Sequence, residues 1–188
     1  MINYELPTEA VINGNTYKIR NKGDYRVVLD AISALNDKEL SQQERIGCAL
    51  FIFYEDTPSK DDMEDALYRL FEFISCDETD YNQEELEKGP EKPPLMDWDH
   101  DFHLLVAPIS KVIGKDIRSL DYLHWFSFIA AYMEIGECTF SQVISIRSKM
   151  QKGQKLDKSD QEYIREHRED IYLPNRLTQE EQDYLTDW

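Results

Sequence analysis

The chain has 188 residues and a formal charge of −17, from 38 acidic against 21 basic side chains. Hydrophobic residues make up 41% of it, enough to offset the entropy of ordering a core, so wholesale disorder is excluded. A field this acidic repels phosphate backbones and disfavours nucleic-acid binding, and no apolar run approaches the roughly 18 to 20 residues that a bilayer span needs.

The first element predicted along the chain is a β-hairpin. Residues 10–12 and 16–19 are rich in β-formers and flank Asn13-Gly14. Asn-Gly tolerates the positive φ angles of a type I′ turn, which joins two antiparallel strands. Two strands alone are marginally stable, so we expect this hairpin to pack against another element.

Three amphipathic helices are predicted next, each with a start signal. Asp24 can cap the first helix, Ser41-x-x-Glu44 is a capping box for the second, and Ser59-x-x-Asp62 repeats that signal before the third. Apolar residues then recur at helical spacing after each start, namely at positions 25, 28, 29, 32 and 35, at 46, 49, 50 and 53, and at 63, 66, 67, 70, 71 and 74.

An acidic linker is predicted at about residues 77–96, where acids, Gly89-Pro90 and Pro93-Pro94 interrupt the apolar pattern. A helix follows from Asp97, with Pro108 expected to kink it and Gly114 to end it.

The most apolar stretch, residues 120–135, is predicted to be a central helix capped by Ser119 and stopped by Gly136. Another helix is expected from Thr139. Beyond residue 150, Ser159-x-x-Glu162 and Thr178-x-x-Glu181 predict two short helices with little apolar content.

These elements predict a mainly α fold: a multi-helix single domain with an N-terminal β-hairpin and a peripheral helical C-terminal arm. We place the helical domain at residues 1–150, with the linker inside it, and the polar arm at 151–188. Cys48, Cys76 and Cys138 stand singly, without a C-x-x-C pair, and are expected to be reduced thiols. Cys48 and Cys138 are expected to pack beside core positions. Residues 1–5 lack the basic and then apolar pattern of a secretion signal, so we expect a cytoplasmic protein.

One cluster has the residue types of a metal site. Two histidines three residues apart can share a helix face, and carboxylates stand beside them in the segment Asp97, Asp99, His100, Asp101 and His103. Acids at a helix start, with solvated histidines, give the same composition through capping alone, and there is no H-E-x-x-H pattern. A metal-dependent enzyme is therefore kept only as an alternative.

The remaining chemistry points to binding. The sequence has no G-x-S-x-G elbow and no glycine-rich phosphate loop, so we expect neither catalytic residues nor a cofactor. Trp98, after the linker, and Trp188, at the last position, are candidate partner-binding anchors. Arg147 and Lys149, in the basic stretch 147–155, are candidates for contacting an acidic partner.

Four segments together resemble the bacteriophage "gp-fifteen" family. They are Leu6-Pro7-Thr8 with Ile12-Asn13-Gly14, Asp97-Trp98-Asp99-x-Asp101, Tyr122-Leu123-His124-Trp125-Phe126, and Phe140-x-x-Val143-Ile144-x-Ile146-Arg147. Their order and spacing match from the amino terminus to about Lys149. The family brings no established catalytic residues.

The resemblance implies a function in phage tails. Family members tend to be encoded between the major tail protein and the tape measure protein, a position that typically supplies tail assembly chaperones. The implied protein is non-catalytic, acts in the host bacterial cytoplasm and binds the tape measure protein and tail-tube subunits, the major tail protein among them. The alternative from composition is an acidic DNA mimic or host-factor-binding protein, since residues 55–101 hold 17 acids against 4 bases. The oligomeric state stays open.

Overall fold

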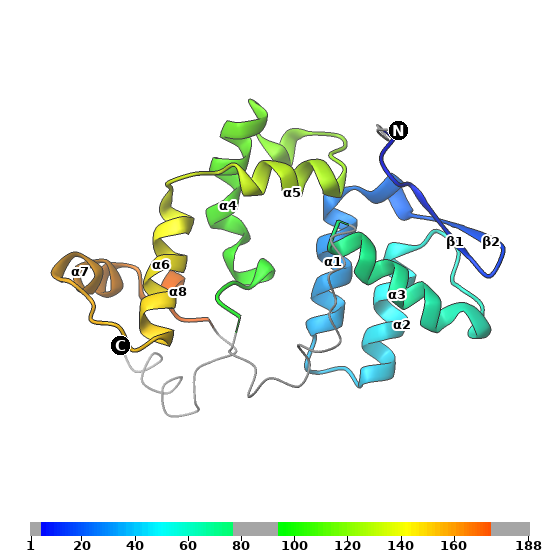
Figure 1. Ribbon diagram of the computed structural model, residues 1–188, viewed down its shortest axis with the longest axis horizontal. Helices are drawn as coiled ribbons and strands as arrows, with labels where there is room; N and C mark the ends of the chain where they lie inside the picture. Colours follow the sequence, from blue (N-terminus) through cyan, green and yellow to red (C-terminus); the bar gives the residue numbers. More distant parts are fainter. Residues whose placement is uncertain (1–4, 77–93, 174–188) are drawn as a thin grey trace. The chain divides into compact units, whose positions relative to one another are not determined.

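The computed structural model describes residues 5–76 and 94–173 (Figure 1). Within them the fold is mainly α with an N-terminal β-hairpin, as predicted. The strands and helices are β1 Glu9–Ile12, β2 Asn15–Lys18, α1 Tyr25–Asn36, α2 Gln42–Phe53, α3 Met63–Ile74, α4 Trp98–Ile113, α5 Trp125–Met133, α6 Thr139–Gln151, α7 Lys158–Glu166 and α8 Arg168–Ile171.

The described residues form two compact units, each with internal contacts of its own. The first unit contains residues 5–76 and 117–133, and the second contains 94–116 and 134–173. Compact units defined by contacts need not fold independently, so the predicted division at residue 150 stays a prediction. The predicted linker falls mostly on residues 77–93, outside the described residues.

The hairpin forms where Asn13-Gly14 predicted it. Asn13 and Gly14 have φ angles of 49° and 84°, and Ile12 pairs with Asn15 across the turn. Ile12 is buried whereas Val11 is exposed, so one face of the hairpin packs inward, as expected for a sheet this small.

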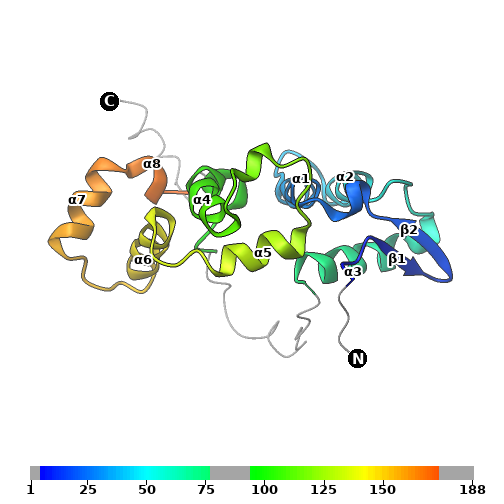
Figure 2. The same ribbon diagram turned by 90° about the horizontal axis from the view of Figure 1, so that it is seen from above.

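Two of the three predicted helix starts of the first unit are confirmed, and the third is displaced. The Asp24 carboxylate accepts from Arg26 N at the start of α1, and Ser41 and Glu44 form the predicted capping box of α2. Ser59 begins a 3₁₀ turn, Lys60–Asp62, and α3 starts only after it. Helices α1 and α2 lie side by side in both views (Figures 1 and 2).

Aromatic rings dominate the interior of the first unit. Tyr25 of α1 stacks on Phe128 of α5 with ring centroids 4.7 Å apart, and Trp125 stacks on the same ring at 5.6 Å. On the other side Phe53 meets Phe73 edge to face at 5.2 Å. Such pairs add about 0.5 to 1.5 kcal/mol each beyond the area they bury.

Glycine is required at position 23. Gly23 has a φ of +76°, and a Cβ there would lie 2.6 Å from Phe73 Cζ and 3.1 Å from His124 Nε2. Any side chain would therefore meet both an unfavourable backbone conformation and the aromatic core.

The helix predicted from Ser119 begins later than expected. Ser119 ends a 3₁₀ turn, and α5 starts at Trp125 because the chain before it is bound to α1: Asp24 accepts from Leu123 N at 2.9 Å. The helix is also not buried on every side: Trp125 and Phe128 are buried, but Met133 is 65% exposed.

In the second unit, α4 begins and ends as predicted. Asp97 accepts from His100 N at 3.0 Å, and Gly114 closes the helix with a φ of 81°. The helix continues through Pro108, and the predicted kink stays a prediction.

The segment after α6 begins differently from the prediction. Asp157, not Ser159, caps α7, with Asp160 completing the capping box. Although the sequence is polar, Ile171 is buried against Val143 and Ile146 of α6. The second predicted helix of the arm, at residues 178–181, lies outside the described residues. In the described part of the chain, none of the helices has both the length and the apolar character to cross a bilayer.

Candidate functional site

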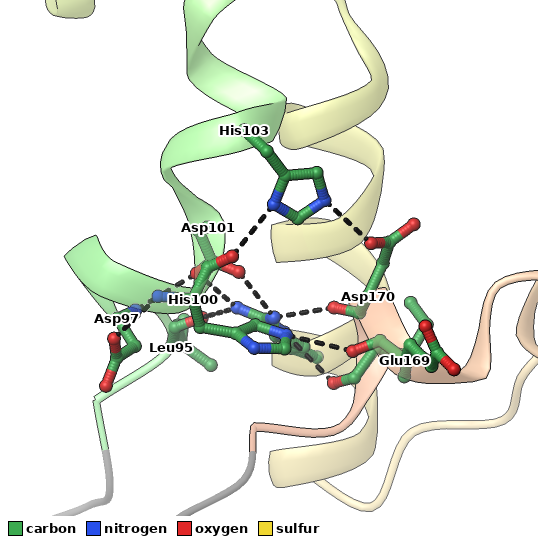
Figure 3. A network of polar contacts seen from close by, with 9 residues as sticks. Leu95, Asp97, His100, Asp101, His103, Glu169 and Asp170 are labelled. Atoms are coloured by element: carbon green, nitrogen blue, oxygen red, sulfur yellow. Dashed lines mark hydrogen bonds and ion pairs between the residues drawn. The ribbon is translucent and has the colours of Figure 1, made fainter.

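A buried arginine connects four segments of the second unit. Arg147 of α6 is 4% exposed and forms a bidentate ion pair with Asp101 of α4, which is fully buried, at 2.7 and 2.8 Å. Its other hydrogen bonds go to backbone carbonyls: Leu95 O at 2.8 Å, Asp170 O at 2.6 Å and Ile171 O at 3.0 Å. Figure 3 shows how Leu95, Asp101 and Asp170 converge on this point.

All five N–H donors of Arg147 are therefore used inside the chain. A buried guanidinium without a spare donor cannot bind a partner, and the structure argues against the predicted partner-binding role of Arg147. Its role is structural: it fixes the ends of segments that have little apolar surface of their own. The paired carboxylate offsets the desolvation of the charge.

Two histidines extend this network towards the surface (Figure 3). His100 Nε2 lies 2.9 Å from Glu169 O, and His103 Nε2 lies 3.0 Å from the Asp170 carboxylate. His103 Nδ1 also lies 2.9 Å from His100 O, so both nitrogens of this ring face acceptors. Carbonyl and carboxylate oxygens only accept, so each of these two His103 contacts is a hydrogen bond when the ring nitrogen that makes it carries a proton.

The predicted metal cluster is thus divided among structural tasks. Asp97 caps α4, Asp101 pairs with Arg147, and the histidines bind α8. In residues 5–76 and 94–173, histidine, cysteine, aspartate and glutamate side chains nowhere gather in a group of three or more that could hold a metal ion. The geometry gives the metal-enzyme alternative no support.

The other predicted anchors have different surroundings. The ammonium group of Lys149 donates to both carboxylate oxygens of Asp160 in α7, at 2.7 and 2.9 Å. This hydrogen-bonded pair raises the pKa of Lys149 and lowers that of Asp160. Trp98 is the first residue of α4 and is half-buried, and Trp188 lies outside the described residues. Whether these three bind a partner stays a prediction.

A second polar cluster, in the first unit, holds the hairpin against the start of α3. The Asp62 carboxylate is 3% exposed and accepts hydrogen bonds from Asn13, Asn15, Tyr17 and Ser59, at 2.6 to 3.1 Å. These bonds, first that of Tyr17, lower the pKa of Asp62 to about 2. Among the described residues no cation pairs with it, so neutral donors alone stabilise its charge.

His124 occupies the interior of the same unit. Its ring is 1% exposed, with Nε2 3.0 Å from Pro7 O and Nδ1 accepting from Phe126 N at 3.1 Å. The donor therefore sits on Nε2 of a neutral ring. Burial lowers the pKa of His124, against the smaller opposing effects of Pro7 O and Asp24.

Most of the exposed large apolar side chains among the described residues lie in the first unit. Phe51 is 63% exposed, Val11 59% and Tyr68 55%, and Phe71 is also exposed although the sequence placed it on an apolar stripe. Cys48 is exposed as well, which corrects the expectation that it packs beside the core. Helical spacing placed Phe71 on the apolar stripe of its helix but did not predict that it lies at the exposed edge of that stripe.

Sequence reasoning missed a groove between the hairpin and α3. It has a volume of about 310 Å³ and is open to solvent. Its lining is Pro7, Glu9, Ala10, Val11, Ile19, Phe53, Arg69, Glu72 and Phe73. A groove of this kind depends on contacts between segments more than fifty residues apart, so no local pattern indicates it.

Comparison with known proteins gives one match. A family model described as "Bacteriophage Gp15 protein" matches residues 2–173, a range that includes every residue that the structure describes. No curated protein and no solved structure matches the chain.

Proposed function

We propose that this chain, which belongs to the bacteriophage Gp15 protein family, is a non-catalytic phage tail assembly protein. The observation that carries the proposal is the family match over residues 2–173, since it makes the protein a bacteriophage protein across both units. The finer role that we propose is a tail assembly chaperone, which acts in the host bacterial cytoplasm and binds the tape measure protein and tail-tube subunits.

The exposed apolar side chains support a client-binding role. A tape measure protein is a long helix whose apolar stripe would aggregate before the tube surrounds it. A protein that covers such a stripe must present apolar groups amid enough charge to resist self-association. Phe51, Tyr68 and Phe71 are exposed on a chain whose formal charge is −17.

The internal bonding of candidate reactive groups supports a non-catalytic role. Arg147, Asp101 and the two histidines of α4 are engaged in holding α8 and the start of α4. A catalytic group needs an acceptor or donor site left for its substrate, and Arg147 has none.

Deletion of the gene from its phage or prophage tests the assembly role. We expect cells without the protein to produce no tails and to accumulate the tape measure protein in the insoluble fraction, and a plasmid copy to restore both. The tape measure protein should also co-purify with the tagged chain. Normal tails in the deletion strain would refute the proposal.

A matched pair of variants tests the client surface. Phe51→Ser combined with Tyr68→Ser removes two exposed rings and should reduce co-purification of the tape measure protein at least fivefold. Met133→Ser changes an equally exposed apolar residue of α5 and serves as the control. Equal loss in both proteins would mean that the rings of α2 and α3 are not specific contacts.

The DNA-mimic alternative is less well supported by the structure. It requires the acids of residues 55–101 to be displayed as an array, but Asp62 and Asp101 are buried and bonded within the chain. Competition between this protein and DNA for a host protein would favour the alternative.

A further inference from the structure

Among residues 5–76 and 94–173, no second strand pairs with the outer edge of strand β1. In a two-residue hairpin the pair that closes the turn, Ile12 and Asn15, exchanges hydrogen bonds, and bonding alternates along the strands from there. Thr8, four residues before Ile12, follows this alternation, because its carbonyl accepts from Ile19 N at 2.9 Å. The N–H and C=O groups of Glu9 and Val11 therefore point away from β2.

The opposite edge of the hairpin is partly occupied. Glu55 N donates to Lys18 O at 2.9 Å, and Ile19 forms a bridge with Tyr54. On this edge Thr16, the partner of Val11, has the outward-pointing groups. Val11 and Thr16 are therefore matched positions on the two edges: Val11 lines the groove and Thr16 does not.

The groove is lined by residues of β1 and of α3 and lies alongside the β1 edge. Strand β1 and helix α3 are neighbours, as Figure 2 shows. Ile19, Phe53 and Phe73, all buried, contribute apolar surface to its lining, and Glu9 and Val11 of the strand line it as well. An unpaired strand edge with an apolar groove beside it is the arrangement used in β-strand addition. There the main chain supplies affinity, and pockets select alternate side chains.

We propose that the β1 edge and its groove bind an extended segment of a partner protein, which adds to β1 as a third strand. Basic and apolar residues alternate along this segment. Its apolar side chains enter the groove, and its lysine or arginine side chains lie near the acids of β1 and α3. Charge supports this choice of partner. Of the charged residues that line the groove, Glu9 and Glu72 are acids and Arg69 is a base, already paired with Glu72 at 2.6 Å.

Charge also argues against the chain itself as the occupant. Residues 77–93 contain seven acids and two bases, and residues 174–188 contain four acids and one base. A second copy would bring the same Glu9 to the edge and a formal charge of −17 with it. Like charges placed across a strand pair are destabilising.

A binding assay with synthetic peptides tests the inference on the full-length chain. The probe is a fluorescein-labelled peptide of about eight residues that alternates lysine and valine, and the comparison peptide alternates glutamate and valine. We expect fluorescence anisotropy to show binding of the lysine peptide, weakening as salt increases, and at least tenfold weaker binding of the glutamate peptide. Equal affinity for the two peptides would overturn the proposed partner chemistry.

Two proline variants separate the edges. Val11→Pro removes the outward N–H of β1 without removing a bond to β2, and proline is tolerated on an edge of this kind. It should weaken binding of the lysine peptide tenfold or more, whereas Thr16→Pro, on the other edge, should leave it within twofold. Equal loss in both variants, or none in Val11→Pro, would overturn the β1 site.

Further measurements keep the test decisive. If circular dichroism shows that Val11→Pro does not fold, Glu9→Lys replaces it. This charge reversal should weaken binding at least threefold, and unchanged affinity would overturn the site.

Dimers detected by light scattering in the wild type and lost in Glu9→Lys would make a second copy the occupant. A variant without residues 2–4 should bind as the wild type does, and a tenfold gain would make those residues the occupant. No phage component enters the assay, so its outcome is independent of the proposed assembly role.

Discussion

Both units contain a buried charged side chain that joins distant segments, but the two charges are stabilised differently. Arg147, in the second unit, is paired with a carboxylate and surrounded by three carbonyl groups. Asp62, in the first unit, has four neutral donors and no cation among the described residues. The hydrogen bonds to Asp62 hold its pKa at about 2, so strong acid removes this second charge. The same structural task is therefore performed by an ion pair in one unit and by hydrogen bonds from neutral groups in the other.

Loss of the arginine should have the largest effect. Arg147→Met leaves the Asp101 carboxylate buried without its partner, which costs about 3 to 5 kcal/mol of unfolding free energy. Urea unfolding measures the loss, and hydrogen exchange should locate it in residues 94–116 and 134–173. Lys149→Met, on the same helix, is the control and should have a much smaller effect, because Lys149 is partly exposed.

A double variant sharpens this prediction. Arg147→Met combined with Asp101→Leu removes both charges, so the protein should recover part of the stability that the single variant loses. If the double variant is less stable than Arg147→Met, the ion pair is not what makes the single change costly.

Acid should release the hairpin in the first unit, with a smaller and more local effect. The pKa of Asp62 is lowered to about 2 in the folded protein, so its contribution is complete above the ordinary value of 3.8. That contribution is lost as the pH falls from 3.8 through about 2. Amide exchange in residues 9–18 should increase over this range. Asp62→Asn should already show increased exchange at neutral pH and depend less on acid.

The exposed neighbour Asp61 provides the control for that measurement. Asp61→Asn should leave the exchange of the hairpin and its acid dependence unchanged. A hairpin that stays equally protected from pH 5 to pH 2 would show that neutral donors hold a protonated Asp62 as well as a charged one.

Protonation of His124 should have the smallest effect, at milder acidity. Its folded-state pKa is lowered below 6.5 by burial, so the unfolded chain binds the proton more readily. The stability that this group contributes is complete above 6.5 and declines as the pH falls below it. Melting temperatures at pH 7.5 and 5 should differ more in the wild type than in His124→Gln. Equal differences in the two proteins would mean that other groups cause the pH dependence.

Local signals predicted what local chemistry decides. Asn13-Gly14 and the Ser41 capping box gave the hairpin and the start of α2, because in each case the stabilising bonds lie within four residues. The predicted start of α5 was wrong because the hydrogen bond that holds the preceding chain, from Leu123 N to Asp24, joins residues 99 positions apart. No pattern in the vicinity of Ser119 contains that information.

The arginine network had a sequence signal that capping and charge arguments overlooked. Asp101 is spaced four and eight residues from Leu105 and Ile109, and Arg147 four and seven residues from Val143 and Phe140, so each lies on the buried stripe of its helix. Two opposite charges on apolar stripes indicate a buried pair. Reading Arg147 as part of a basic run, residues 147–155, led instead to the prediction of a partner contact.

The converging bonds of Arg147 have a consequence for how the second unit opens. Leu95 and Ile171, at the two ends of the described part of this unit, are bonded to the same guanidinium. Neither segment can detach without leaving a donor of that group unsatisfied in a buried environment, which destabilises the hold on the other. The two ends should therefore fray as one cooperative event, with a shared opening free energy, instead of loosening one after the other.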